Sequence, residues 1–199
     1  MTKSILLVGV GGQGIILVSK LLTIGLMEAG YDVKMSEIHG MSQRGGSIST
    51  HVRYGKQVYS PVIEKGDTDL LISFEKMESI RWLNYLKPQG HLLVNNYKIN
   101  PLTVLIGENQ YPDDKIDEEL KSLKAIIIDA ADKSKELGNI KVMNVILLGS
   151  VIKIMELEHI DWENIIKQNI KEGLIDINIK ALYEGMRLAD WIKGETYEL

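Results

Sequence analysis

The chain has 199 residues, 45% of them hydrophobic and 25% charged, with a formal net charge of −4 at pH 7. This length and composition suit one large domain with a substantial core, and the absence of a Lys/Arg block argues against nucleic-acid binding. With no cysteine, the chain cannot form a disulfide, use a thiol nucleophile or ligate an iron–sulfur cluster through thiolates. No apolar run reaches the roughly 20 residues of a membrane span, and no signal-peptide pattern opens the chain. We therefore expect a cytoplasmic protein without membrane contact.

The first forty residues have the pattern of a β-α-β unit. The continuous apolar run at 4–10 is typical of a strand buried on both faces. Apolar residues then recur at helical spacing over 14–30, and Gly30 suits the position just after a helix end. Residues 31–37 predict a second strand.

Alternating polar and apolar residues follow. Residues 47–55 and 56–63 fit a hairpin or a pair of antiparallel strands. Two further strands, at 67–74 and 90–96, flank a helical segment. That helix should end near Lys87, because proline disfavours helical geometry in the residue before it.

The second half of the chain changes from mixed to helical patterns. Strands are expected at 102–107 and 124–130, with a short acidic helix at 112–123 between them. Beyond Asn139 three segments have helical spacing, namely 144–155, 161–170 and 174–194. The first of these is apolar enough to be a buried helix, and Asp161 is suited to cap the second.

The order of elements predicts the α/β class. We expect a three-layer α/β/α sandwich whose Rossmann-like, mixed sheet is mostly parallel, with antiparallel pairing between 47 and 63 and with C-terminal helices. The whole chain, 1–199, would form one domain, with an α/β core at 1–138 and a helical part at 139–199 packed on it.

The sequence GVGGQG places Gly9, Gly11 and Gly14 between a strand and a helix. Glycines there allow a tight turn and let a phosphate approach backbone N–H groups at the positive end of the helix. Two interpretations stay open, phosphate binding and close packing of helix on strand. Glu37 lies close to where a Rossmann fold keeps its ribose-binding acid, yet a glycine-rich loop follows it instead of a short loop and a helix.

A second polar segment, SEIHGMSQRGGS at 36–47, follows the second strand. If it lies at the carboxyl end of the sheet, where α/β proteins bind ligands, it could present donors and a cation. Arg44 is the strongest candidate, because its guanidinium can hold a phosphate or carboxylate in two parallel hydrogen bonds. Alternatively, Glu37 pairs with Arg44 and His39 only caps a loop.

The candidate cofactor-binding residues are Gly9, Gly11, Gly12, Gln13, Gly14, Glu37, His39, Gln43 and Arg44. No catalytic residue and no metal ligand can be assigned. His51 is expected on the surface of the sheet, and His91 and His159 show no pattern that indicates a function.

Together, LLVGVGGQGIILVSKLL and EIHGMSQRGGSISTHVRYG resemble the gamma-type subunit, also found as a fused domain, of the 2-oxoacid:ferredoxin oxidoreductases. The resemblance covers roughly the first 60 residues in motifs, and the order of later elements fits the same domain. Within this family, SEIHGMSQRGGSI looks most like the small (beta) subunit of indolepyruvate oxidoreductase, in which the domain is a separate chain.

The resemblance implies oxidative decarboxylation of a 2-oxoacid to an acyl-CoA, with electrons passing to ferredoxin. It also implies that thiamine diphosphate, magnesium and iron–sulfur clusters lie on a larger partner subunit, and that this chain alone is inactive, binds no cofactor tightly and contacts CoA at most. The alternative is an independent NAD(P)- or FAD-binding Rossmann-type oxidoreductase domain. In either case, the loops at 9–14 and 38–46 should lie side by side at one edge of the sheet.

Overall fold

The computed structural model describes residues 2–39 and 45–196. Its strands are β1 (Lys3–Val10), β2 (Asp32–His39), β3 (Ser47–Gly55), β4 (Thr68–Ser73), β5 (Leu86–Asn95) and β6 (Ile126–Ile128). Its α-helices are α1 (Ile15–Glu28), α2 (Lys76–Arg81), α3 (Leu102–Leu105), α4 (Asp113–Ser122), α5 (Ala130–Glu136), α6 (Met143–Ile154), α7 (Trp162–Asn169) and α8 (Ile175–Thr196). Short 3₁₀ turns are η1 (Leu83–Tyr85), η2 (Ile140–Val142) and η3 (Glu172–Leu174).

The strands form one mixed sheet in the order β2-β3-β1-β4-β5-β6. β1, β4, β5 and β6 are parallel to one another, whereas β3 is antiparallel to both β1 and β2. The predicted α/β class and the mostly parallel sheet are therefore confirmed. β3 separates the two strands of the β1-α1-β2 unit, and this insertion determines where the polar residues of β2 lie.

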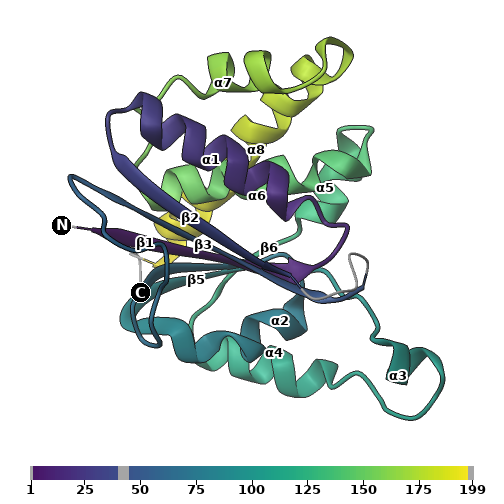
Figure 1. Ribbon diagram of the computed structural model, residues 1–199. Coiled ribbons are helices and arrows are strands. Elements are labelled where there is room, and N and C mark those ends of the chain that lie inside the picture. The colour runs from purple at the N-terminus through teal and green to yellow at the C-terminus, as the bar shows by residue number, and fades with distance from the viewer. Residues whose placement is uncertain (1, 40–44, 197–199) are drawn as a thin grey trace.

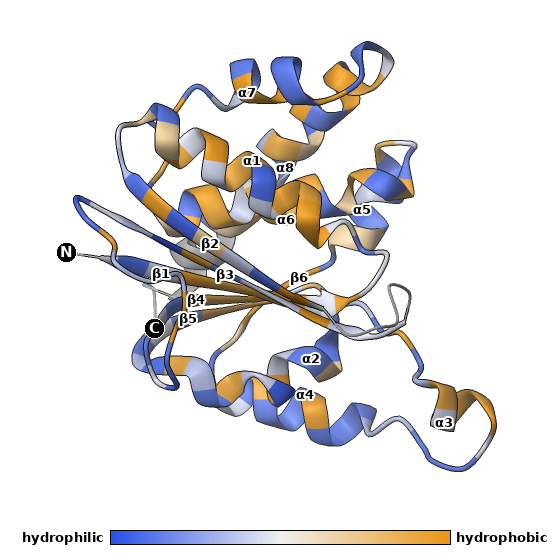
Figure 2. Cartoon of the chain, in the orientation of Figure 1, coloured by the Kyte–Doolittle hydropathy of each residue, from blue (hydrophilic) through white to orange (hydrophobic). Residues whose placement is uncertain are grey.

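Helices cover both faces of this sheet (Figure 1). The upper face in this view carries α1 and α5 to α8, and the lower face carries α2 and α4. Ile5 and Leu7 of β1 belong to the core under the first layer, and Leu6 and Val8 belong to the core under the second. All four side chains are fully buried, which explains the unbroken apolar run, and Figure 2 shows the same hydrophobic colour along the central strands.

Two predicted helix ends are confirmed in detail. Gly30 has a φ of 84°, and the N–H groups of Gly30 and Tyr31 donate to the carbonyls of Met27 and Leu26 at 3.0 and 3.1 Å. This pair of bonds is a Schellman motif, which satisfies carbonyls left unpaired at a helix end. At the start of α7, Asp161 Oδ1 accepts from the N–H of Asn164 at 3.1 Å.

The predicted strand at 56–63 is wrong. Backbone N–H groups of this segment donate to side chains and not to a partner strand. The N–H of Val58 donates to Asp32 at 2.8 Å, and the N–H of Ile63 donates to Nδ1 of His51 at 3.0 Å. The segment thus crosses over the lower face of β3, where it covers His51. The antiparallel pairing predicted for this region belongs to 47–55 alone.

Two further boundaries differ from the prediction. The helix expected up to Lys87 ends at Arg81, and β5 already begins at Leu86. Pro88 is tolerated in β5 because the register between β4 and β5 shifts there, with Thr68 opposite Leu86 and Leu70 opposite His91, so its missing N–H is not needed. The strand expected at 102–107 is also wrong, because this segment contains the one-turn helix α3.

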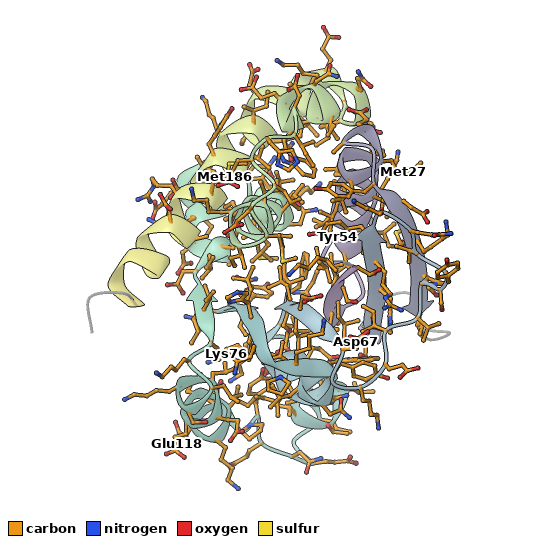
Figure 3. The ribbon with its side chains drawn as sticks, turned by 90° about the vertical axis from the view of Figure 1, so that its left-hand side faces the viewer. Met27, Tyr54, Asp67, Lys76, Glu118 and Met186 are labelled. Carbon is orange, nitrogen blue, oxygen red and sulfur yellow. The ribbon has the colours of Figure 1, made fainter. Side chains whose placement is uncertain are left out.

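The C-terminal helices pack on the upper face. α6 is buried along almost its whole length, as its apolar sequence predicts, and it crosses α8 so closely that a Cβ on Gly149 or Gly185 would meet the backbone of the other helix. Figure 3 shows this layer around Met186 and the lower layer around Lys76 and Glu118, with the sheet between them. No helix within 2–39 and 45–196 is both long and apolar enough to cross a bilayer.

Candidate functional site

The carboxyl ends of β1 and β4 form the topological switch point of the sheet. The chain leaves β1 toward α1 on the upper face and leaves β4 toward α2 on the lower face (Figure 1). In open α/β sheets, the crevice at such a point is the usual ligand site. A cleft of about 510 Å³ opens there on the lower side. Its lining includes the polar residues Ser47, Glu75, Glu78 and Arg81 and the apolar residues Met77, Ile99, Leu102 and Leu105.

The glycine loop contacts the described end of the second polar segment. The N–H of Gly11 donates to the carbonyl of Gly46 at 2.9 Å, and the N–H of Gly45 reaches the carbonyl of Gly11 at 3.5 Å. The two loops are therefore side by side at the carboxyl edge, as expected. The reason is that β3, which lies next to β1, begins there with Ser47 opposite Val10.

Gln13 has a structural role in this loop. Its Oε1 accepts from the N–H of Val10 and its Nε2 donates to the carbonyl of Phe74, both at 2.7 Å. Both ends of the buried amide are thus used on backbone groups, and the side chain joins the glycine loop to the end of β4. The amide therefore supports the loop, and a cofactor contact by Gln13 stays a prediction.

Close packing accounts for Gly9 and Gly14. A Cβ on Gly9 would lie 2.7 Å from Gln13 Oε1 and 2.9 Å from Phe74 Cβ. Gly14 has a φ of 78°, and a Cβ there would collide with the side-chain amide of Asn144. Gly12, with a φ of 102°, meets nothing within 4 Å, so a side chain is excluded there only by backbone conformation.

The N-terminus of α1 still offers donors. Among the described residues, no side chain forms a capping hydrogen bond at its N-cap, Gly14, and the first N–H groups of an α-helix have no acceptor within the helix. These groups lie at the positive end of the helix dipole. The upper side of the switch point can therefore stabilise an anion.

The lower side has the opposite character. Glu75 is buried, where it accepts from Tyr111 Oη at 2.5 Å and from the N–H groups of Glu78 and Ile99 at 3.0 and 3.2 Å. Burial, and then this bond to the Glu75 carboxylate, raise the pKa of Tyr111 above its usual range. Tyr111 therefore stays protonated as a donor.

Glu78 forms the second part of this acidic floor. Its Oε2 accepts from the hydroxyl of Ser47 at 2.5 Å, and its Oε1 lies 3.4 Å from Nε of Arg81. Glu75 and Glu78 were not among the predicted site residues. Their position was nevertheless readable, since Glu75 follows a predicted parallel strand directly and such positions lie at the ligand-binding edge.

The polar residues of β2 lie away from this crevice. Glu37 is opposite Thr50 of β3, which is opposite Leu7 of β1, so Glu37 is two strand spacings, or about 10 Å, from the middle of β1. Its Oε1 accepts from the hydroxyl of Ser19 on α1 at 3.2 Å. His39 ends β2, level with Gly9 across β3.

The candidates Gln43 and Arg44 lie outside the described residues. His51 is on the sheet, as predicted, but it is buried under the 56–63 segment. In the described part of the chain, no group of three or more histidine, aspartate or glutamate side chains is placed to hold a metal ion.

Comparison with known proteins gives a consistent assignment. Residues 4–188 match the family described as pyruvate ferredoxin/flavodoxin oxidoreductase. The chain is 36% identical over 194 residues to the indolepyruvate oxidoreductase subunit IorB of Pyrococcus horikoshii, covering 94% of this chain and 95% of that protein. It is also 36% identical over 197 residues to the IorB subunit of Thermococcus kodakarensis, covering 96% and 98%.

Two solved structures share the fold. The gamma subunit of a keto/oxoacid ferredoxin oxidoreductase from Geobacter sulfurreducens has a TM-score of 0.71 and 18% identity, over 95% of this chain and 97% of that one. A 2-oxoglutarate:ferredoxin oxidoreductase from Magnetococcus marinus, solved with 2-oxoglutarate, coenzyme A and succinyl-CoA bound, has a TM-score of 0.71 and 19% identity. The match covers 95% of this chain but 31% of that one, so the same fold occurs both as a separate subunit and inside a longer chain.

Proposed function

The chain belongs to the pyruvate ferredoxin/flavodoxin oxidoreductase family, and from that premise we propose that it is the small subunit of a cytoplasmic 2-oxoacid:ferredoxin oxidoreductase with indolepyruvate as substrate. The observation that carries the proposal is the end-to-end match with IorB subunits, which covers at least 94% of this chain and 95% of each of the two relatives. These relatives are separate short chains named as subunits, as this one would be.

The proposed complex divides the chemistry between two chains. The 2-oxoacid loses carbon dioxide, two electrons pass singly to ferredoxin, and CoA takes the acyl group. The iron–sulfur clusters would belong to the larger subunit, because this chain has no cysteine to supply thiolate ligands. Thiamine diphosphate and Mg²⁺ are proposed to lie on that subunit too, as the resemblance implies.

The alternative of an independent NAD(P)- or FAD-binding domain is not supported. A Rossmann site places the acid of the second strand beside the glycine loop, where it reaches the ribose. Here β3 lies between β1 and β2, and Glu37 is level with Leu7 and bonded to Ser19. An adenosine ribose bound at the glycine loop would therefore not meet this carboxylate.

For CoA, we propose a contact through its pyrophosphate at the N-terminus of α1. The N–H groups of the first turn, which have no acceptor within the helix, and the helix dipole favour an anion at this position. Arg44 is proposed to complete the contact from the adjacent loop, since Gly45 and Gly46 are already hydrogen-bonded to Gly11. The acidic cleft on the lower side would repel the same phosphates.

Reconstitution tests the proposal. The chain is co-expressed with the thiamine-binding larger subunit of the same organism, and indolepyruvate- and CoA-dependent reduction of ferredoxin is measured. Activity is expected from the complex and from neither chain alone. Tight flavin binding, or enhanced NAD(P)H fluorescence, by the isolated chain together with no association would instead favour the independent oxidoreductase.

A further inference from the structure

The α3 segment exposes an apolar surface. Leu102, Leu105 and Ile106 are 71, 67 and 58% exposed, although large aliphatic side chains gathered in one turn are normally buried. Figure 1 shows α3 projecting from the lower layer, and Figure 2 shows it in the hydrophobic colour. The segment is anchored at its base, because Val104 and Tyr111 pack with the lower core.

This surface continues into the switch-point cleft. Leu102 and Leu105 line the cleft together with the apolar side chains of Met77 and Ile99. A partner segment that covers Leu102 and Leu105 therefore enters the same cleft that Glu78 lines. We call this cleft, together with the exposed side chain of Ile106 that follows Leu105 at the end of α3, the α3 cleft.

The charge of the α3 cleft selects the chemistry of its occupant. Its charged lining residues are Glu75, Glu78 and Arg81 among the described residues, and Arg81 lies 3.4 Å from Glu78. These three described side chains together carry one net negative charge. A cationic side chain is therefore stabilised there, whereas an anion such as a phosphate is repelled.

The exposed area argues against a second copy of this chain. Burial of a leucine side chain corresponds to about 60–120 Å² of apolar area, so the three exposed aliphatics offer on the order of 200 Å². A symmetric contact through them would bury on the order of 400 Å² in total, well below the roughly 1,200 Å² at which stable specific interfaces begin. A larger partner that also fills the cleft meets this requirement more readily.

We infer that the α3 cleft is where the larger, thiamine-binding subunit docks, through a segment that places a Lys or Arg between apolar side chains. This inference rests on the proposed function, which supplies the partner. It assigns the lower side of the switch point to subunit contact and leaves the upper side for CoA. The apolar side chains would seat on Leu102, Leu105 and Ile106, and the cation would reach Glu78.

The test measures association of the isolated small subunit with the larger subunit. Leu102→Glu and Leu105→Glu should each weaken association by roughly ten- to a hundredfold, because each places a charge in an apolar contact. The thermal melting of the isolated variants should stay that of the parent, since both side chains are exposed. Val62→Glu is the matched control, because Val62 is 57% exposed on the 56–63 segment, outside the cleft.

The cation is tested separately by Glu78→Gln, which keeps the shape and removes the charge. It should weaken association by about tenfold and reduce its dependence on salt. Unchanged association of this variant, provided that it melts normally, overturns the cationic partner. If the parent binds the larger subunit and the two leucine variants bind equally well, the α3 cleft is not the docking surface, whereas the proposed function stands.

Two other outcomes also decide the matter. A parent chain that does not bind the larger subunit at all overturns the proposed function and this inference together. Self-association of the parent that Leu102→Glu abolishes would show that the occupant is a second copy.

Discussion

Asn144 and Gly14 are in contact although 130 positions separate them, with Nδ2 of Asn144 3.3 Å from the carbonyl oxygen of Gly14, to which it donates. This bond joins the first turn of α6 to the residue that precedes α1. The amide of Asn144 also occupies the space that a Cβ on residue 14 would need, so a glycine is required there independently of any ligand. Part of the glycine motif thus serves close packing, and mutation can separate this role from the proposed binding of an anion.

Gly14→Ala should lower the free energy of unfolding by about 2–4 kcal/mol. A residue with a Cβ is strained at a φ of 78°, and its Cβ would collide with the Asn144 amide. Thermal or urea unfolding measures the effect. Gly12→Ala is the control, because Gly12 also has positive φ but no neighbour within 4 Å, so it should cost about 1 kcal/mol.

A double-mutant cycle identifies the collision. Combining Gly14→Ala with Asn144→Ser removes the amide that the new methyl would strike. The double variant should therefore lose less stability than the sum of the losses in the two single variants. Strict additivity would mean that the cost of Gly14→Ala is backbone strain alone.

The stability of the protein should respond differently to loss of the Gln13 hydrogen bonds and to a negative charge at this position. Gln13→Met removes the acceptor of the Val10 N–H and the donor to the Phe74 carbonyl. It should lower the free energy of unfolding by about 1–3 kcal/mol. Gln13→Glu should cost more at pH 7, because it sets a carboxylate against the carbonyl that accepts from Nε2 at 2.7 Å in the parent. Denaturant unfolding at pH 7 and pH 5 measures both variants.

The pH comparison distinguishes repulsion from poor packing. When the introduced carboxyl is protonated it can donate to the Phe74 carbonyl, so the deficit of Gln13→Glu relative to the parent should shrink at pH 5. A deficit that stays constant between the two pH values would contradict the proposed contact.

His51 should make stability depend on pH. Burial lowers the pKa of His51 below 6.5, and its Nδ1 accepts from the N–H of Ile63, which requires a neutral ring at that nitrogen. The unfolded chain then binds the proton at higher pH than the folded chain. The free energy of unfolding should therefore be highest above pH 6.5 and fall as the pH drops below it.

His51→Asn tests this assignment, because the Oδ1 of asparagine can still accept from Ile63 while no proton is taken up. Urea unfolding from pH 8 to pH 5 should give a flatter profile for the variant than for the parent. Parallel profiles would show that other groups cause the acid dependence.

The sequence shows which segments are apolar, but it does not show reliably which secondary structure they form or what covers them. The run at 4–10 was correctly predicted as a strand, because both faces of β1 are covered within the chain. The run at 102–107 is equally apolar but forms α3, and its leucines are exposed. An apolar run in the sequence does not show whether residues of the same chain or of a partner cover it. The proposal that a partner covers the α3 cleft follows from this distinction.

The sequence predicted those features of the site that follow from the order of strands along the chain, and missed those that depend on which strands are neighbours in the sheet. The loops at 9–14 and 45–46 do meet, but the role of Gln13 depends on Phe74, 61 positions away. Likewise, the spacing of Glu37 suggested a ribose contact because two consecutive parallel strands are usually neighbours. The inserted β3 removes that contact, and only the pairing of the strands reveals it.

Ile16→Asp separates the CoA proposal from every effect on folding. Ile16 is 51% exposed in the first turn of α1, where an acidic side chain interacts favourably with the helix dipole. The isolated variant should therefore be as stable as the parent or more stable, by about 0.3–1 kcal/mol.

A phosphate bound at the same N–H groups would meet the new carboxylate, so the KM for CoA should rise roughly three- to tenfold. The reconstituted complex is assayed at varied CoA, with Ile16→Asn as the uncharged control. A KM unchanged in Ile16→Asp would place the CoA phosphates elsewhere, because neither instability nor altered shape could then mask a contact at this helix end.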